Sequence, residues 1–368
     1  MKKFLFPVLT MAMAFVATSC SSDEPGVAPE GNFTPTETET ITFNISNPEG
    51  GIRSRGQDAN GWFGDGQDAE ELQYCIYMMG NDNEWRIWKS SDNATDPVPV
   101  KIDQSTGNSW NLSVPIIKGA VWEAYFYADF YGKQVTDYRG TKVEWSNKCL
   151  HFVGRYGNRD NGDAFFGSIS SGEYANNILN GDESTIILKR PLMQVNMLSN
   201  EFDDKTIQNL FPLLVETSMQ FSNGTEVGIP EYYYFMEDRL TFKNNTMDDG
   251  DGGGGLEFRR VKYNGKQYDL FFMGYFLAPK TSSTNSTDWP TAPSELQFRI
   301  YTYGPVSLDK IITVPFSSLG TNPYTQNTRV IIYTDISDGG SGFISEDPSF
   351  HVDITPGWDF NDSNLRYE

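Results

Sequence analysis

The sequence predicts an all-β protein made of two β-sandwiches in series. Aromatic residues make up 14% of the chain, which favours strands, and 34 glycines and 19 prolines supply frequent turns. Apolar and aromatic runs of strand length recur at close intervals, whereas helical periodicity is almost absent. A short helix is expected over 203–211, where Pro212 ends it. The 368 residues are about twice the length of a typical domain, so we expect two domains.

The expected strands fall into two groups, divided where an apolar strand gives way to the polar run "NEFDDK". This boundary near residue 200 gives an N-terminal sandwich over 40–200 and a C-terminal sandwich over 201–368. The strands expected in the first group are 40–46, 72–79, 85–89, 109–116, 121–130, 184–190 and 192–198, and those in the second are 213–221, 268–278, 295–303, 310–316, 328–336 and 350–354.

The first and the last of these strands share one alternating pattern. The apolar positions are Ile41, Phe43 and Ile45 in the first strand, and Phe350, Val352 and Ile354 in the last. Because side chains alternate between the two faces of a strand, each strand has one apolar face that must pack against a sheet. Segment 337–349, before the last strand, is rich in Gly and Ser and is expected to be a flexible connector.

The chain opens with a secretory leader. Lys2 and Lys3 precede an apolar run too short to span a bilayer, so residues 1–19 are interpreted as a signal peptide. The small residues before Cys20 resemble a bacterial lipobox, in which a peptidase cuts before the cysteine and its thiol carries a diacylglyceryl group. We therefore expect Cys20 to be lipidated; an ordinary cleaved signal is the alternative. Residues 20–39 are polar and Pro-rich and are expected to form a flexible tether.

Charge and motifs exclude some functions. The formal charge is -21, and loss of Lys2 and Lys3 with the leader makes it -23, which repels nucleic acid and anionic lipid headgroups. The two histidines, His151 and His351, lie in strand-like segments, and no metal-ligand cluster, EF-hand spacing or nucleophile motif is present. We therefore expect no enzyme activity, metal or cofactor, although a sequence does not reveal a pair of carboxylates brought together in space.

Two cysteines follow the lipobox. Cys75 and Cys149 would pair in an oxidising compartment if the fold brought them together, which the sequence does not show. Cys75 lies in an apolar run and suits a small buried hydrophobic residue equally well. The pairing stays open at this point.

A basic loop follows the first strand. In "NPEGGIRSRGQDANG", residues 47–61, Arg53 and Arg55 stand among Gly, Asn and Asp. An Arg-specific protease needs a guanidinium on extended, flexible backbone, and the surrounding glycines favour such a backbone. The loop is therefore interpreted as a processing site; a solvated turn is the alternative.

The order of these motifs resembles that of a fimbrillin-family protein of the Bacteroidales, a subunit of type V pili. The shared motifs are the lipobox at Cys20, a first strand followed by "IRSRG", the run "IILKRPLMQVNM" (186–197), "FFMGYFLAP" (271–279) and the ending "VPFSSL…NTRVIIYTDI…FHVDITPGW". The resemblance implies two transthyretin-like β-sandwiches, exported as a lipidated precursor to the cell outer membrane. The acidic "SSDEP" after the lipobox is similar to the signal that sends such lipoproteins to the cell surface, or is an ordinary acidic tether.

The resemblance also implies an assembly mechanism that serves adhesion. In members that polymerise, an Arg-specific protease cuts after the first strand and removes the lipid and the strand together. A neighbouring subunit's C-terminal segment then fills the groove. In this chain the cut would fall at Arg53 or Arg55, the displaced strand would carry Ile41, Phe43 and Ile45, and the donor would carry Phe350, Val352 and Ile354. The implied partners are other pilus subunits, the protease and, through the lipid anchor, the outer membrane.

The rival interpretation is a surface glycan-binding lipoprotein that does not polymerise. It would stack sugar rings on exposed aromatic side chains, for which the candidates are Trp85, Trp88, Trp110, Trp122, Trp145, Trp289 and Trp358. Most Trp and Tyr of β-sandwiches are packed in the core, however, and the Tyr-rich run 231–242 is expected to be a buried strand. A coplanar row of exposed Trp would favour sugar binding, whereas an N-terminal strand over an apolar groove would favour assembly.

Overall fold

The structure of the protein is a computed structural model. It describes residues 37–46, 71–91, 100–101, 109–129, 140–153, 164–180, 185–199, 213–221, 224–242, 259–263, 266–280, 294–302, 309–315, 326–333, 351–356 and 365–367. Nearly all regular elements in these ranges are strands, which confirms the predicted all-β class.

The strands are numbered in chain order. Those of the N-terminal half are β1 (Thr38–Ser46), β2 (Glu71–Met79), β3 (Trp85–Ser90), β4 (Val100–Lys101), β5 (Ser109–Ile117), β6 (Trp122–Asp129), β7 (Gly140–Glu144), β8 (Cys149–Val153), β9 (Ala164–Ser170), β10 (Thr185–Ile187) and β11 (Leu192–Ser199). Those that follow are β12 (Leu213–Gln220), β13 (Glu226–Val227), β14 (Pro230–Tyr234), β15 (Arg239–Phe242), β16 (Arg259–Tyr263), β17 (Lys266–Leu277), β18 (Glu295–Thr302), β19 (Asp309–Pro315), β20 (Thr328–Tyr333), β21 (His351–Pro356) and β22 (Leu365–Tyr367). Helical structure in the described residues comprises α1 (Ser171–Asn180) and a short 3-10 helix, η3 (Trp145–Asn147).

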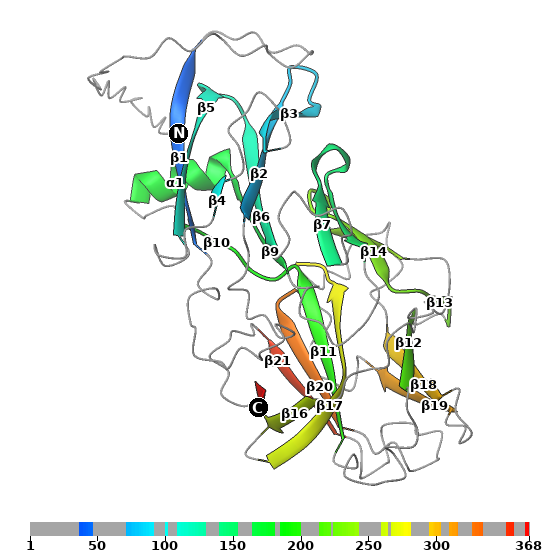
Figure 1. The fold of residues 1–368 in the computed structure, drawn as a ribbon. Helices are drawn as coiled ribbons and strands as arrows, with labels where there is room; N and C mark the ends of the chain where they lie inside the picture. Colours follow the sequence, from blue (N-terminus) through cyan, green and yellow to red (C-terminus); the bar gives the residue numbers. More distant parts are fainter. Residues whose placement is uncertain are drawn as a thin grey trace, which may run out of the picture.

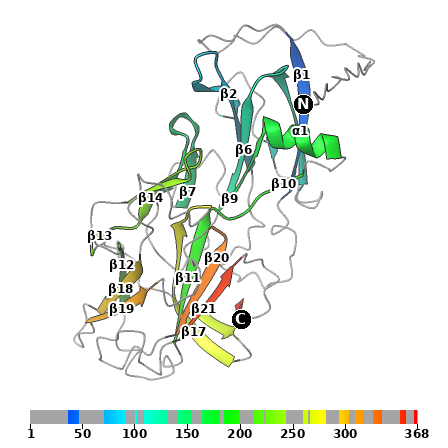
Figure 2. The ribbon, with the colours of Figure 1, turned by 180° about the vertical axis from the view of Figure 1, so that it is seen from behind.

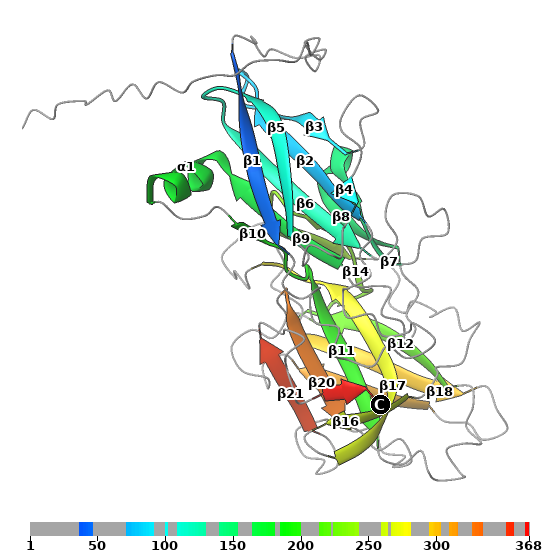
Figure 3. The ribbon, with the colours of Figure 1, turned by 60° about the vertical axis from the view of Figure 1, so that its left-hand side comes forward.

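The N-terminal strands form two sheets that pack against each other. β1 lies between β10 and β5 in a three-stranded sheet, and β3, β2, β6 and β9 form the other sheet, with β4 joined to β2. Side chains from both sheets meet in one hydrophobic cluster, which includes Phe43, Leu112, Phe126 and Phe165. Figures 1 and 3 show these strands in the upper part of the molecule, with α1 beside β1.

The C-terminal strands also form a pair of sheets. One has six strands in the order β21-β20-β11-β17-β16-β22, and the other has four in the order β13-β12-β18-β19. Phe272 of β17 meets Phe298 of β18 edge to face, with ring centres 5.4 Å apart, so the core of this part lies between the two sheets. Figure 2 shows β11, β20 and β21 side by side, as their pairing requires.

A further four-stranded sheet takes strands from both halves of the sequence. Its order is β15-β14-β8-β7, and β8 pairs antiparallel with β14 through Leu150 and Tyr233. Both side chains are fully buried in a second hydrophobic cluster, which also holds Tyr77 of β2 and Phe272 of β17. This cluster therefore links the N-terminal sheets with the C-terminal ones.

The pairing of β11 differs from the predicted division of the chain at residue 200. β11 precedes that position, yet it pairs antiparallel with β17 and parallel with β20, both of which follow it. All residues of β11 are buried, which suits a strand in the middle of a large sheet that is covered on both faces. The chain therefore changes from one pair of sheets to the other between β10 and β11, at residues 188–191, because pairing partners and not local polarity decide where a strand belongs.

The observed elements agree with the sequence prediction in some segments and differ from it in others. β7, β9 and α1 are found in segments without a predicted element, and β8 contains His151, which the sequence places in a strand-like segment. β22 follows segment 350–354, so the strand predicted there is not the last one. The Tyr-rich run 231–242 folds as the hairpin β14–β15, with Tyr233 buried and Tyr232 and Tyr234 half-buried. The helix predicted over 203–211, the tether 20–39 and the connector 337–349 lie outside the described residues. No helix within the described ranges is long and apolar enough to cross a membrane.

Candidate functional site: the first strand and its groove

β1 holds its sheet together. It pairs antiparallel with β5 along its whole length, from Thr38 opposite Ile117 to Ser46 opposite Ser109. On its other side it pairs parallel with β10, through Asn44 opposite Thr185 and the two residues after it. Among the described strands, β5 pairs with β1 alone, so loss of β1 would leave β5 with no neighbour in its sheet. We call the position that β1 occupies between β5 and β10 the β1 groove.

The alternating pattern of β1 divides its side chains between core and solvent, as the sequence predicts. Ile41, Phe43 and Ile45 are 6%, 0% and 1% exposed. Thr40 and Thr42 point the other way and are exposed, and the Thr42 hydroxyl lies 2.8 Å from that of Ser113 on β5. One face of the strand is therefore a row of three apolar side chains inserted into the core.

Phe43 is the best anchored of the three. Its ring centre lies 5.3 Å from that of Phe126 and 5.6 Å from that of Trp122, both on β6 of the opposite sheet. A third ring, Tyr174 of α1, lies 6.2 Å away. All three contacts are edge-on or tilted, the arrangement in which aromatic pairs attract beyond their buried area. Phe43 therefore occupies an aromatic pocket that other elements build.

The burial of these side chains sets the energetic cost of removing β1. Full burial of an Ile or Phe side chain stabilises a fold by about 1.5–3 kcal/mol, so the three together contribute roughly 5–9 kcal/mol. Removal would also strip hydrogen-bond partners from β5 and β10, and buried backbone groups without partners cost further free energy. An empty β1 groove is therefore unstable and favours any strand that restores both kinds of contact.

The structure does not describe all the other residues that the sequence predicts for this site. Cys20, Arg53, Arg55 and Phe350 lie outside the described residues, so their roles stay predictions. The arginines belong to the segment between β1, which ends at Ser46, and β2, which begins at Glu71.

For the predicted donor strand, the structure gives the pairing of the backbone. β21 pairs antiparallel with β20, with Val352 opposite Ile332 and Ile354 opposite Val330. Among the described strands it pairs with β20 alone and lies at one edge of the six-stranded sheet. An edge strand separates from its sheet by breaking one ladder, whereas β1 breaks two.

The tryptophans predicted as a sugar platform are packed in the protein where the structure describes them. Trp110, Trp122 and Trp145 are buried, and Trp85 and Trp88 are half-buried on β3. The indole N–H of Trp88 donates to the carbonyl of Pro115 (2.9 Å), which ties β3 to β5. Trp289 and Trp358 lie outside the described residues. The described tryptophans therefore form no exposed row.

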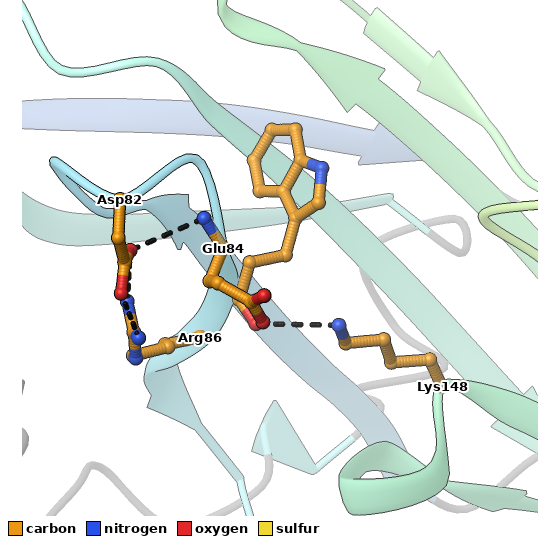
Figure 4. Close-up of polar contacts among 5 residues, drawn as sticks. Asp82, Glu84, Arg86 and Lys148 are labelled. Atoms are coloured by element: carbon orange, nitrogen blue, oxygen red, sulfur yellow. Dashed lines mark hydrogen bonds and ion pairs between the residues drawn. The ribbon is translucent and has the colours of Figure 1, made fainter.

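The turn between β2 and β3 carries a polar cluster, which Figure 4 shows in close-up. Asp82 and Arg86 form a two-pronged ion pair, and the Arg86 guanidinium holds the pKa of the Asp82 carboxyl at about 2. Lys148, which follows η3, donates from Nζ to the carbonyl oxygen of Trp85 (3.2 Å). This contact occupies a backbone acceptor on the edge strand β3, so the cluster fixes a hairpin and protects a sheet edge.

A second polar cluster lies on the β7–β8 hairpin. Glu144 accepts from the Asn147 amide (2.8 Å), lies 2.9 Å from Nδ1 of His151 and forms an ion pair with Lys142 (3.1 Å). Burial alone would raise the pKa of Glu144, but these three contacts outweigh it and lower the pKa to about 2. The His151 ring stacks on Tyr232 of β14, with centres 4.2 Å apart, so the cluster connects the β7–β8 hairpin with the β14–β15 hairpin of the same sheet.

The cysteine beside this cluster is not arranged as a nucleophile. Burial raises the pKa of the Cys149 thiol to about 12, and the thiol lies 4.0 Å from Oε2 of Glu144, a negatively charged neighbour that raises the pKa further. A thiol needs to be ionised to react, so Cys149 is held in an unreactive state. Cys149 and Cys75 are both buried, and no disulfide joins them. Within the described ranges no group of His, Cys, Asp and Glu side chains comes together as a metal site.

Sequence reasoning finds the three residues of β1 but misses the residues that receive them. Trp122 and Phe126 lie in a predicted strand, yet only the fold shows that they face Phe43. Tyr174 lies on a helix that the sequence pattern does not predict. A local signal for that helix exists in Ser170-Ser171-Gly172-Glu173, the spacing of a capping box.

No protein-family model and no curated protein matches the chain. Among solved structures it is similar to a proposed cell adhesion protein from Bacteroides uniformis (9% identity, 87% of this chain and 98% of the other, TM-score 0.39). It is also similar to the fimbrial anchor protein Mfa2 from Porphyromonas gingivalis (10% identity, 87% and 97%, TM-score 0.35). A third similar structure is a fimbrial assembly protein from Parabacteroides distasonis (9% identity, 90% and 99%, TM-score 0.34).

Proposed function

We propose that this chain is a fimbrillin-like cell-surface lipoprotein, a subunit or accessory subunit of a type V pilus that assembles by strand exchange and serves adhesion. The observation that carries the proposal is the position of β1. The first described strand lies in the middle of a sheet, buries three alternating apolar side chains and is followed in the sequence by a segment with two arginines. On this proposal the protein acts by assembly and not by catalysis.

The first step of the proposed mechanism is proteolysis. The lipid on Cys20 anchors the precursor to the outer membrane, and an Arg-specific protease cuts after Arg53 or Arg55. Gly50, Gly51 and Gly56 surround these arginines and favour the extended backbone that a protease binds. The cut separates β1 from β2, so the covalent link between the plug and the body is lost.

The second step is replacement of β1 by a strand from another subunit. The incoming strand would pair with β5 and β10 and place alternate apolar side chains where Ile41, Phe43 and Ile45 lie. The strand predicted over 350–354, with Phe350, Val352 and Ile354, has this period. Its edge position in the six-stranded sheet supports its release. Strand addition of this kind joins the tail of one subunit to the groove of the next, and such a contact repeats without closing.

Limited digestion with an Arg-specific protease tests the first step. We expect one cut, at Arg53 or Arg55, located by mass spectrometry, followed by fibres in electron microscopy. The matched control is the double variant Arg53→Gln/Arg55→Gln, which keeps the loop but lacks the guanidinium groups and should stay uncut and monomeric. Resistance of the unmodified protein, or a cut that yields only stable monomers, would overturn the pilus-subunit proposal and favour an anchored accessory or glycan-binding lipoprotein.

The donor strand is tested separately. Val352→Asp/Ile354→Asp should leave cleavage unchanged and abolish fibres, because charged side chains do not enter an apolar groove without a large desolvation cost. Asp353→Asn, on the alternate position of the same strand, is the control and should still polymerise. Fibres from the doubly substituted protein would assign the donor role to another segment.

A further inference from the structure

α1 is attached to the protein at its beginning and is exposed along the rest of its length. Its first turn has a capping box, in which the amide N–H of Ser170 donates to Glu173 Oε2 (2.8 Å) and the amide N–H of Glu173 donates to Ser170 Oγ (3.2 Å). No residue of the helix is buried, and Ile178 and Leu179 are 57% and 82% exposed. The helix therefore depends on few contacts for its position.

Tyr174 is the apolar side chain of α1 that packs on the N-terminal core. Its ring lies 6.2 Å from Phe43 of β1 and 5.7 Å from Trp122 of β6. Burial raises the pKa of the Tyr174 hydroxyl, and the carboxylate of Glu39, also on β1, raises it further. Tyr174 thus contacts β1 in two ways. Its ring lies near Phe43, and the carboxylate of Glu39 on the same strand acts on its hydroxyl.

We propose that α1 is a latch on β1, closed by the contact between Tyr174 and Phe43. With β1 in place, Tyr174 forms one wall of the aromatic pocket and opposes the departure of Phe43. When β1 leaves, Tyr174 loses Phe43 and keeps Trp122 of β6 as a ring contact, so the packing of α1 weakens; a coupling between two elements acts equally in both directions. The role of the latch in strand exchange rests on the proposed function, but the coupling itself is a property of the intact chain.

The latch has one consequence before strand exchange and another after it. Before the cut it keeps the plug strand from opening spontaneously, which protects an apolar groove from water and from unintended strands. After the plug leaves, α1 is held less firmly on the outside of the subunit, by Trp122 of β6 and without Phe43. How firmly α1 is held on the protein surface would then depend on whether the β1 groove is filled.

Hydrogen exchange on the purified, uncut protein tests the coupling. Tyr174→Ala should make the amides of residues 40–46 exchange about three- to tenfold faster, the size expected for loss of one aromatic pair. Tyr174→Phe keeps the ring, and Leu179→Ala changes an exposed residue of the same helix, so both should stay within about twofold of the unmodified protein. The amides of β11 serve as an internal reference for global unfolding. Equal exchange at 40–46 in Tyr174→Ala and the unmodified protein would overturn the latch.

The rate at which β1 leaves the cut protein tests the role of the latch. With a fluorescent label on the N-terminal fragment, we expect its release to be about three- to tenfold faster from Tyr174→Ala than from Tyr174→Phe. Equal release rates would overturn the role of α1 in exchange. If the fragment stays bound in every variant, the proposed strand exchange fails, and hydrogen exchange on the uncut chain still decides whether α1 and β1 are coupled.

Discussion

Phe43 shows how a single residue connects the sequence pattern, the packing and the proposed function. Alternation with threonine and asparagine is enough to predict that its side chain is buried, and it is fully buried. The identity of its neighbours is beyond such a pattern, because Trp122, Phe126 and Tyr174 reach it from two other elements. Local periodicity predicts the apolar face of a strand, and only the fold determines the pocket that receives it.

Replacement of Phe43 should destabilise the uncut protein strongly. Phe43→Ala removes a fully buried ring and leaves a cavity, for which we expect a loss of about 3–5 kcal/mol in the free energy of unfolding. Urea denaturation followed by tryptophan fluorescence measures it. Thr42→Ala, on the exposed face of the same strand, is the control and should change stability by about 0.5 kcal/mol or less. Similar losses in the two variants would contradict the burial assigned to Phe43.

Glu144 should contribute a pH-dependent part of the stability. Its pKa in the folded protein is about 2, below the ordinary value of 4.5, so folding favours the ionised form. The stabilisation is therefore complete above about pH 4.5 and is lost as the pH falls towards about 2. Denaturation midpoints of the unmodified protein should fall more steeply across this interval than those of Glu144→Gln. Parallel curves would show that the contacts with Asn147, His151 and Lys142 do not favour the charged form.

At the scale of elements, strands with a strong apolar run are predicted well and weakly patterned ones are missed. β2, β5, β6 and β17 are long and apolar, and their predicted limits agree with the structure to within a few residues. β7 has the sequence "GTKVE", in which Lys142 and Glu144 face away from the core, so little apolar signal remains. The sequence pattern does not predict α1, because the helix packs on the core mainly through Tyr174 and needs no continuous apolar stripe to do so.

The capping box should control the stability of α1. Ser170→Ala removes the hydroxyl that caps the helix, and such losses cost about 1 kcal/mol, so amides of α1 should exchange roughly fivefold faster. Ser170→Thr keeps the hydroxyl, which accepts from the Glu173 amide and donates to the Glu173 carboxylate, and should behave like the unmodified protein. If the alanine variant shows unchanged protection, the packing of Tyr174 alone would be sufficient to hold the helix.

At the scale of the whole molecule, the arrangement of sheets is the part that the sequence predicts least. The all-β class follows from composition and strand spacing, but the four-stranded sheet of β7, β8, β14 and β15 depends on the pairing of β8 with β14, which are far apart in the chain. The same holds for β11, whose partners β17 and β20 both lie in the second half. Strand pairing over such separations leaves no local trace, so a boundary placed by polarity alone differs from the one that pairing gives.

The net charge should govern how fast the proposed fibres form. A cut after Arg53 or Arg55 removes six acidic and three or four basic residues, so the cut subunit carries a formal charge of -18 or -19 and subunits repel one another at low ionic strength. Raising salt from about 10 mM to about 150 mM shortens the screening length from about 30 Å to about 8 Å, and fibre growth after cleavage should accelerate. Light scattering follows the growth, and the uncut protein is the control that should stay monomeric at both salt concentrations. Slower growth at the higher concentration would indicate that attraction between opposite charges drives assembly.

The parallel pair of β1 and β10 has a consequence for the order of folding. β1 is among the first segments to be synthesised, yet the partner of Asn44 is Thr185, and that residue must be made before the sheet can close. Contacts between distant residues also form slowly, because a long loop has to be closed first. A strand that is made early therefore gains its second hydrogen-bonded neighbour late, and its edge towards β10 stays unpaired until Thr185 is made, although β6, which covers Phe43, is made well before.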